Sequence, residues 1–307
     1  MVDPAIAAES DAAELAVGGA AAGAPDPSLL QITYYTDPLC SWSWAFEPQW
    51  RRLRYELGDQ LHWSYRMGGM IPDWQRFNDP LNDVSRPVQM GPLWYQVRTF
   101  SGMPINERIW FTDAPASSYP ACIAVKAAEQ QGPAAGEHYL RQLRAAVMVE
   151  GRNIARLDVQ QAVAHELAAT QSGFDAKQFV QDLESPAVLE GLREDLKDVR
   201  WREIGRFPTL ILRNHTAQAI LIVGYRPYDA LLAAVRQLAP AVTLSASIDI
   251  ISYIRHWGQL TTREIAEVTQ ETPQATESML AERATAGELQ RQPIPPTDQS
   301  LWSLPQT

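Results

Sequence analysis

The chain has 307 residues, with 26 lysines and arginines against 36 aspartates and glutamates, which gives a net charge of −10 at pH 7. Because nucleic-acid backbones are anionic, this balance argues against DNA or RNA as the main partner. The two cysteines, Cys40 and Cys122, are too few for a disulfide framework and are typical of a reducing compartment. We therefore expect a cytoplasmic protein that acts on other proteins.

The first 28 residues are rich in alanine, glycine, proline and acidic side chains, and they contain no lysine or arginine. A secretory signal needs a basic start followed by an apolar run, so residues 1–28 are predicted to be a disordered tail. No stretch reaches the roughly 18 uninterrupted apolar residues that would cross a bilayer. We expect no membrane partner.

Residues 29–84 are predicted to form the first half of an α/β domain. Gln31–Tyr35 is β-branched and aromatic, which is typical of a buried strand. Ser43–Leu57 has apolar residues spaced by three and four and is followed by glycine, which predicts an amphipathic helix. Leu61–Met67 alternates apolar and polar side chains, as a second strand does. This order makes a βαβ unit.

Residues 85–198 have helical patterns throughout and no strand-like segment. Strand patterns return in residues 199–240, where Phe207–Leu212 and Ala219–Val223 predict a hairpin and Tyr228–Leu238 a helix. Without the helical block the order is β-α-β followed by β-β-α, which is the arrangement of a thioredoxin fold. We predict an α/β thioredoxin fold with a large helical insertion between its two halves.

Cys40 lies between the first predicted strand and the first predicted helix. The free N–H groups and the dipole of a helix N-terminus favour a thiolate, and the hydroxyl of Ser43 could donate a hydrogen bond to the sulfur. We interpret Cys40 as a catalytic nucleophile with a lowered pKa. The alternative is an ordinary small residue, buried and inert at a turn.

Ser43 stands where a Cys-x-x-Cys pair would have its second thiol. That thiol normally resolves the mixed disulfide formed by the first, and a serine cannot do so. A substrate thiol, glutathione or another low-molecular-weight thiol would have to release Cys40. The pattern therefore favours disulfide isomerisation or monothiol exchange, with no bound cofactor.

Phe207 and Pro208 begin the predicted third strand. A proline at a strand start has no N–H to donate to the ladder. In a thioredoxin arrangement, a cis bond between these residues would place the backbone of Phe207 beside Cys40. Pro208 joins Cys40 and Ser43 as a candidate catalytic residue, and Phe207 and Trp42 are candidate substrate-binding residues. Trp42 is expected to be the most exposed aromatic side chain of the motif.

Four separated segments resemble the DsbA-like superfamily, in the same order. Residues 37–48 resemble its Asp-Pro-x-Cys-x-Trp-Cys active-site segment, and residues 63–70 the strand and Gly-Gly that follow. Residues 118–128 resemble an early part of its helical insertion, and residues 205–210 its cis-proline loop. The resemblance covers roughly residues 31–238. The most similar branch is the cytoplasmic one, which contains FrnE-like predicted dithiol-disulfide isomerases and adaptors that present substrates to the ClpXP protease.

The resemblance implies that Cys40 is the nucleophilic cysteine, that Ser43 replaces the resolving cysteine, and that Pro208 is the cis-proline. The serine departs from the family pattern and leaves dithiol oxidase activity in doubt. Kappa-class glutathione transferases and hydroxychromene carboxylate isomerases, which bind glutathione, are a weaker match. They have a serine at the position of Cys40.

Two further sets of residues have an ordinary structural interpretation. Cys122 could resolve Cys40 from across a groove, but its Ala-rich helix favours a packing residue. None of the five histidines lies at metal-ligand spacing with another histidine or with both cysteines, so no metal site is predicted.

Residues 248–294 are predicted to form a separate C-terminal helical module that resembles a winged helix. DNA contact would need a basic second or third helix. These helices are acidic instead, with Glu264, Glu267, Glu271, Glu277 and Glu282 against Arg263 and Arg283. We expect a protein-interaction module or packing against the main fold, and a loose tail after Pro295.

Two functions remain open from the sequence. One is a thiol-disulfide exchanger that acts through Cys40 alone. The other is a thioredoxin-fold adaptor that binds a partner protein without redox chemistry. The oligomeric state is left open.

Overall fold

The computed structural model describes residues 30–245, 248–295, 297 and 299–305. The predicted disordered tail, residues 1–28, lies outside the described residues. Within the described ranges, no helix has both the length and the apolar character needed to span a membrane.

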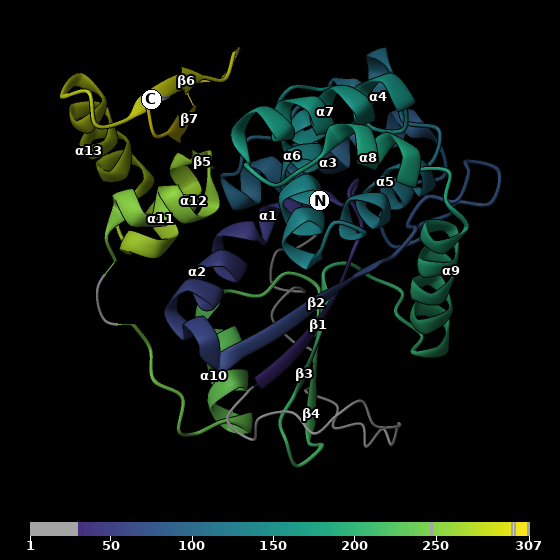
Figure 1. Cartoon of the computed structure of the whole chain (residues 1–307), viewed down its shortest axis with the longest axis horizontal. Coiled ribbons are helices and arrows are strands. Elements are labelled where there is room, and N and C mark those ends of the chain that lie inside the picture. The colour runs from purple at the N-terminus through teal and green to yellow at the C-terminus, as the bar shows by residue number, and fades with distance from the viewer. Residues whose placement is uncertain (1–29, 246–247, 296, 298, 306–307) are drawn as a thin grey trace.

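A four-stranded sheet lies in the lower half of the molecule in Figure 1. Its strands are β1 (Leu30–Thr36), β2 (Leu61–Met67), β3 (Thr209–Arg213) and β4 (Ala219–Val223), and their order across the sheet is β2-β1-β3-β4. β1 is parallel to β2 and antiparallel to β3, and β4 is antiparallel to β3. The predicted thioredoxin sheet is confirmed.

Helices cover both faces of this sheet (Figure 1). α2 (Glu47–Leu57) and α10 (Tyr228–Leu238) pack on one face, and α9 (Pro186–Trp201) lies against the other. Tyr34 of β1 points into the first layer and its neighbour Tyr35 into the second. This follows from the strand geometry, in which successive side chains point to opposite faces.

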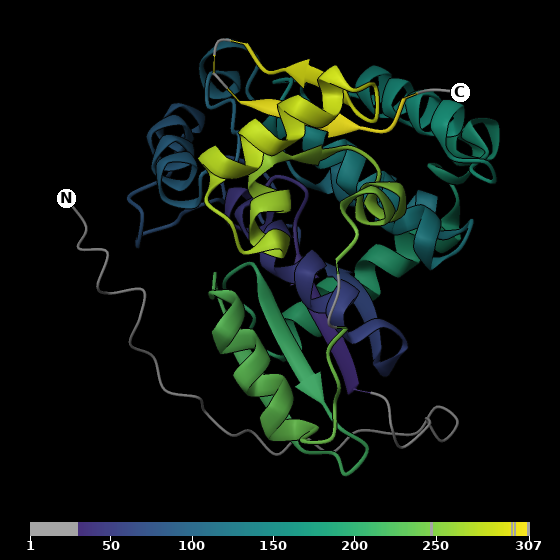
Figure 2. The same cartoon turned by 90° about the vertical axis from the view of Figure 1, so that its left-hand side faces the viewer.

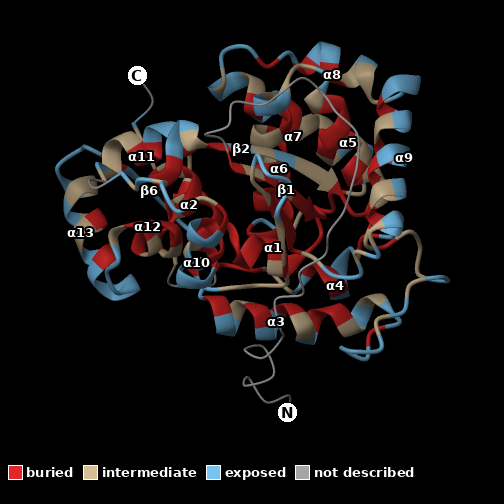
Figure 3. Ribbon diagram, turned by 90° about the horizontal axis from the view of Figure 1, so that it is seen from below, coloured by how far each residue is buried: buried red, intermediate tan, exposed pale blue. Residues whose placement is uncertain are grey.

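The predicted helical insertion is also confirmed. Its helices are α3 (Met90–Ser101), α4 (Ile109–Thr112), α5 (Tyr119–Glu129), α6 (Pro133–Met148), α7 (Leu157–Thr170) and α8 (Ala176–Asp182), before α9 returns the chain to the sheet. Figure 3 shows that buried residues line the inward sides of these helices. One cluster of buried apolar side chains runs through the insertion and reaches Leu39 and Trp44, on either side of Cys40.

The single helix predicted over Ser43–Leu57 was wrong. The structure has two helices, α1 (Ser41–Ala45) and α2, which meet at Phe46. Pro48 has no N–H, so it cannot donate to the carbonyl of Trp44, and the helical hydrogen-bond ladder is interrupted there.

The C-terminal module has the winged-helix order of elements. They are α11 (Ile250–Trp257), β5 (Leu260–Thr261), α12 (Thr262–Thr269), α13 (Pro273–Thr285), β6 (Gln290–Pro293) and β7 (Ser300–Ser303), and the strand order is β5-β7-β6. The expected loose tail after Pro295 was wrong, because β7 pairs with both other strands and the indole of Trp302 is buried in the module core. A strand this short has too weak a pattern to be found in the sequence.

Buried ion pairs attach this module to the rest of the fold. Glu264 of α12 is fully buried, and its carboxylate lies 2.8 Å from Arg141 of α6 and 3.6 Å from Arg51 of α2. Glu264 also accepts the backbone N–H of Thr261 at 2.8 Å, which closes a capping box at the start of α12. The module is therefore fixed to both α2 and α6.

Glu47, at the start of α2, continues this network. Its carboxylate pairs with Arg51 at 2.9 Å and with Arg144 of α6, and Arg144 also donates to the hydroxyl of Thr36 at the end of β1. Burial alone would raise the pKa of Glu47, but the neighbouring guanidinium groups of Arg51 and Arg144 outweigh it and lower the pKa to about 2. Glu47 is therefore charged throughout the physiological range.

We predict that Glu264→Gln destabilises the protein by about 3 kcal/mol, because it leaves buried arginine charge without its partner. Glutamine keeps a side-chain oxygen for the N–H of Thr261, so the change tests the charge. The measurement is the free energy of unfolding by urea. Glu282→Gln is the control, since Glu282 is exposed on α13 and has no ion-pair partner among the described residues. Equal effects of the two substitutions would contradict the ionic attachment.

Candidate functional site

Cys40 is the N-cap residue of α1, directly after the loop that follows β1. Its backbone is extended, and its N–H donates to the carbonyl of Asp37 at 3.1 Å. Pro38 and Leu39 form the turn, and the short helix begins at Ser41. The structure therefore places the cysteine at a helix entry, as the sequence predicts.

The sulfur atom of Cys40 makes two hydrogen bonds. It accepts the backbone N–H of Ser43 at 3.4 Å, and its S–H donates to the carbonyl of Phe207, also at 3.4 Å. Cys40 is only 4% exposed. Burial raises the pKa of the Cys40 thiol, and Ser43 and the more distant Arg144 offset it only in part. The expectation of a lowered pKa was therefore wrong, because desolvation outweighs the helix N-terminus here.

Ser43 is fully buried one turn beyond Cys40. Its backbone N–H makes the hydrogen bond of standard geometry to the sulfur, and its side chain also acts to lower the pKa of Cys40. The hydroxyl has no hydrogen-bond partner of standard geometry in the part of the chain that the structure describes. Ser43 thus occupies the resolving position, in contact with Cys40, but it has no thiol with which to resolve a mixed disulfide.

The loop before β3 lies against the cysteine. The Phe207–Pro208 peptide bond is cis, and the carbonyl of Phe207 is the acceptor for the Cys40 thiol. The ring of Phe207 packs over Gly68, where an added Cβ would lie 2.1 Å from a ring carbon. The Gly-Gly that follows β2 is therefore needed for close approach to the proline loop, a contact that sequence reasoning missed.

The buried carboxylate of Asp37 holds the site together, a role that the sequence did not predict. One oxygen accepts the N–H of Leu39 at 2.9 Å, and the other accepts the N–H of Met70 at 2.7 Å and the hydroxyl of Ser118 at 2.9 Å. Burial raises the pKa of Asp37 despite these hydrogen bonds. The cysteine loop, the Gly-Gly loop and α5 therefore meet at one side chain.

Cys122 is fully buried on α5. Its thiol donates at 3.5 Å to the Asp37 carboxylate oxygen that also accepts from Met70 and Ser118. Burial is the main reason that the pKa of the Cys122 thiol is raised well above that of a free thiol, and the negative charge of Asp37 is the second. Both cysteines are free thiols. These contacts agree with the interpretation of Cys122 as a packing residue.

Trp42 is the most exposed aromatic side chain of the motif, as predicted, because Trp44, Phe46 and Trp50 are fully buried. It is half-buried within a cluster of aromatic side chains. Its ring lies 5.4 Å from that of Phe100 and 6.1 Å from that of Tyr225, and these two rings lie 5.3 Å apart. Phe100, at the end of α3, is 51% exposed. The cluster forms an apolar surface beside Cys40, and its residues come from three distant parts of the sequence.

The C-terminal module borders this aromatic cluster. Gln49 donates to the hydroxyl of Tyr225 at 2.8 Å and to Glu267 of α12 at 3.4 Å. Arg263 of α12 donates to the carbonyl of Ser101, next to Phe100, at 3.2 Å. The position of the cluster therefore depends on the module.

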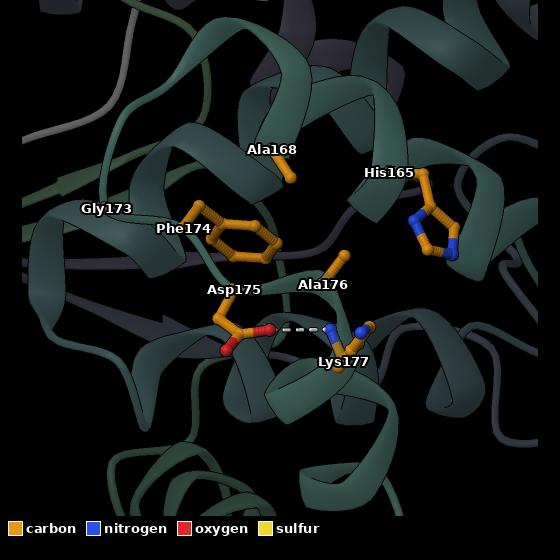
Figure 4. A pocket seen from close by; sticks show the side chains of 7 residues that line it. All are labelled: His165, Ala168, Gly173, Phe174, Asp175, Ala176 and Lys177. Atoms are coloured by element: carbon orange, nitrogen blue, oxygen red, sulfur yellow. Dashed lines mark hydrogen bonds between the residues drawn. The ribbon is translucent and has the colours of Figure 1, made fainter.

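A separate open pocket lies between the end of α7 and the start of α8 (Figure 4). It is lined by His165, Ala168, Gly173, Phe174, Asp175, Ala176 and Lys177. The Asp175 carboxylate in it accepts the backbone N–H of Lys177 at 2.8 Å, which is an ordinary helix cap. No predicted site residue lines this pocket.

We predict that Gly68→Ala destabilises the protein by about 1 to 3 kcal/mol, since the new methyl group would overlap the ring of Phe207. Gly205→Ala is the matched control, because a Cβ at Gly205 would meet no atom within 4 Å. Thermal unfolding of both variants measures the difference. A Gly68→Ala protein as stable as the control would show that the Phe207 ring moves aside without cost.

We predict that Cys40 reacts slowly with iodoacetamide at neutral pH, since its thiol is buried and its pKa is raised. The rate should keep rising at pH values above about 8.5, the pKa of a free cysteine. A Cys122→Ser background isolates Cys40 and keeps a donor to Asp37. A rate that is already maximal at pH 7 would show an ionised, accessible thiol and would contradict the geometry.

Comparison with known proteins agrees with this description. Residues 34–233 match the family described as thioredoxin. A ClpXP adapter protein SpxH from Halalkalibacterium halodurans is 30% identical over 201 residues, which are 65% of this chain and 64% of that relative. The SpxH of Shouchella clausii is 28% identical over 259 residues, which are 83% of each protein. The match therefore spans less than two thirds of the first relative and most of the second.

Among solved structures, a candidate protein disulfide isomerase from Nitrosomonas europaea has a similar fold. Its TM-score is 0.56 at 23% identity, over 68% of this chain and 97% of that one. Such a likeness concerns the fold alone. The family match covers most of the chain, so the chain belongs to the thioredoxin family, with a DsbA-like fold that carries inserted helices and with sequence similarity to ClpXP adapter proteins.

Proposed function

We propose that this protein is a binding adaptor built on a thioredoxin fold, which holds a partner protein without dithiol redox chemistry. The observation that carries the proposal is the state of Cys40. Its thiol is buried, donates a hydrogen bond to Phe207 and has Ser43 where a second thiol would be. A dithiol oxidase needs an accessible thiolate and a resolving thiol.

The similar proteins indicate which kind of adaptor this chain would be. Both SpxH proteins are ClpXP adapters, and one of them matches over most of its length. We infer that this chain likewise delivers a protein substrate to a ClpXP-type protease, and that it does so in the cytoplasm. Two free thiols in the folded protein agree with a reducing compartment.

The aromatic cluster supplies a surface for such a partner. Phe100 presents half of its side chain to solvent while its inner edge packs on Trp42 and Tyr225. A large aromatic side chain that is exposed yet held by neighbours binds with little loss of conformational entropy. The cluster also contacts the C-terminal module through Gln49, so a partner could touch both units.

The chain and the ClpXP of its own organism test the proposal. The chain should accelerate degradation of its substrate protein, and Cys40→Ser should do so equally, because serine can still cap α1 and donate to Phe207. Phe100→Ala should weaken substrate binding by about 1 to 2 kcal/mol. Tyr95→Ala is its matched control, since Tyr95 lies on the same helix and is 52% exposed. Loss of activity in Cys40→Ser would contradict the adaptor proposal.

A second candidate is monothiol exchange, favoured by the N–H of Ser43 that points at the sulfur. The Cys40 thiolate would attack one sulfur of a substrate disulfide, form a mixed disulfide and release the other sulfur as a thiolate. A substrate thiol or glutathione would then displace Cys40. Loss of function in Cys40→Ser, together with fast alkylation at neutral pH, would favour this candidate.

A further inference from the structure

The outer edge of β4 has unused backbone hydrogen-bonding groups. The N–H of Gly224 donates to the carbonyl of Pro208 at 2.7 Å, so these two residues form a hydrogen-bonded pair of the antiparallel ladder. Such pairs alternate along a ladder. Ile220 and Ile222 therefore point their backbone groups toward β3, and Ala219, Leu221 and Val223 point theirs outward.

No other described part of the chain takes up these outward groups. The hydrogen bonds of turns, loops and side chains do not reach the backbone of Ala219, Leu221 or Val223. The opposite edge of the sheet is different, because Asp195 of α9 accepts the N–H of Met67 in β2 at 3.0 Å and pairs with Arg66. One edge of the sheet is capped by a charged group and the other is not.

The sequence of β4 lacks the features that keep edge strands from pairing. It reads Ala-Ile-Leu-Ile-Val, without a charge, a proline or a glycine. Proteins usually protect exposed edges with a charge, a proline, a bulge or a covering segment. On the α9 side, Ala219 and Leu221 pack beside Val199 and Ile204 but stay half-buried. An added strand would complete this apolar layer.

The segments on either side of β4 in the sequence are rich in arginine. Residues 199–228 contain five arginines and one glutamate, with no lysine or aspartate, in a protein whose net charge is −10. Arg206 lies before the start of β3 and Arg213 at its end, and Arg200 is in the last turn of α9. None of these three has an ion-pair partner among the described residues. A segment that pairs with β4 would thus meet positive charge at both ends.

We propose that the β4 edge binds an extended segment of the partner protein as an added strand, apolar at its centre and acidic at its ends. This rests on the proposed adaptor function and names the chemistry of the partner. Main-chain hydrogen bonds to Ala219, Leu221 and Val223 would supply affinity, and the arginines would supply selectivity.

A second copy of this chain fits the edge less well. Antiparallel pairing of two β4 strands would place the Val223 end of one copy beside the Ala219 end of the other, where Arg213 lies on the paired β3. The two copies would thus meet with their arginines near one another. Like charges at such contacts oppose association.

The test compares Leu221→Pro with Leu221→Ala in the full chain. Both lose the leucine side chain, but only proline removes the outward N–H, and the ladder to β3 does not use that N–H. The probe is a labelled peptide of alternating valine and threonine with glutamates at both ends, followed by fluorescence anisotropy. Two control peptides have lysines in place of the glutamates or methyl groups on alternate backbone nitrogens.

We expect Leu221→Pro to bind the acidic peptide about tenfold more weakly than Leu221→Ala does, a difference of about 1.4 kcal/mol. Both control peptides should bind weakly to the wild-type chain. If Leu221→Pro fails to fold, the double variant Arg206→Glu with Arg213→Glu still tests the proposal, because it should weaken binding of the acidic peptide. Equal binding of acidic and N-methylated peptides would overturn the proposal. So would a dimer of the wild-type chain in ultracentrifugation that Leu221→Pro dissociates.

The ClpXP assay separates this proposal from the adaptor function. If Leu221→Pro and the arginine variant accelerate degradation as the wild type does, the edge is not the docking site and the adaptor function stands. If the peptide results hold but no substrate is delivered to ClpXP, the edge site stands and the adaptor function fails.

Discussion

The pairing of Glu47 with Arg144 is the interaction on which the arrangement of the molecule depends. Glu47 begins the helix that follows the cysteine motif, and Arg144 comes from the middle of the insertion and also donates to Thr36 at the end of β1. Charges this deeply buried are stable only when paired and hydrogen-bonded. Sheet, motif helix and insertion therefore hold one relative position, and Arg51 extends the network to Glu264 of the C-terminal module.

The same tight arrangement accounts for the burial and the raised pKa of Cys40. A helix N-terminus alone would favour the thiolate, but the cysteine lies under the Phe207 loop and beside the buried carboxyl group of Asp37. In this environment the protonated thiol serves as a hydrogen-bond donor. The sulfur joins the two halves of the thioredoxin fold through its hydrogen bond to the carbonyl of Phe207.

Two surfaces of this scaffold are suited to a protein partner, and they differ in chemistry. The aromatic cluster around Phe100 offers apolar contact next to the cysteine motif and the C-terminal module. The β4 edge offers backbone hydrogen bonds beside arginines. Both include residues near the Phe207 loop or the turn after β4, so a single extended partner could reach both.

The sequence by itself determined the strand order of the thioredoxin part, the helical insertion, and the places of Cys40, Ser43 and Pro208, because hydrophobic periodicity and short motifs are local signals. Only the tertiary structure decided the burial and raised pKa of Cys40, the hydrogen bonds that meet at the Asp37 carboxylate, the close contact of Gly68 with the Phe207 ring, and the aromatic partners of Trp42. Each of these depends on contacts between residues that are dozens to more than a hundred positions apart. Desolvation and the pairing of buried charges arise from such packing, which no local pattern encodes.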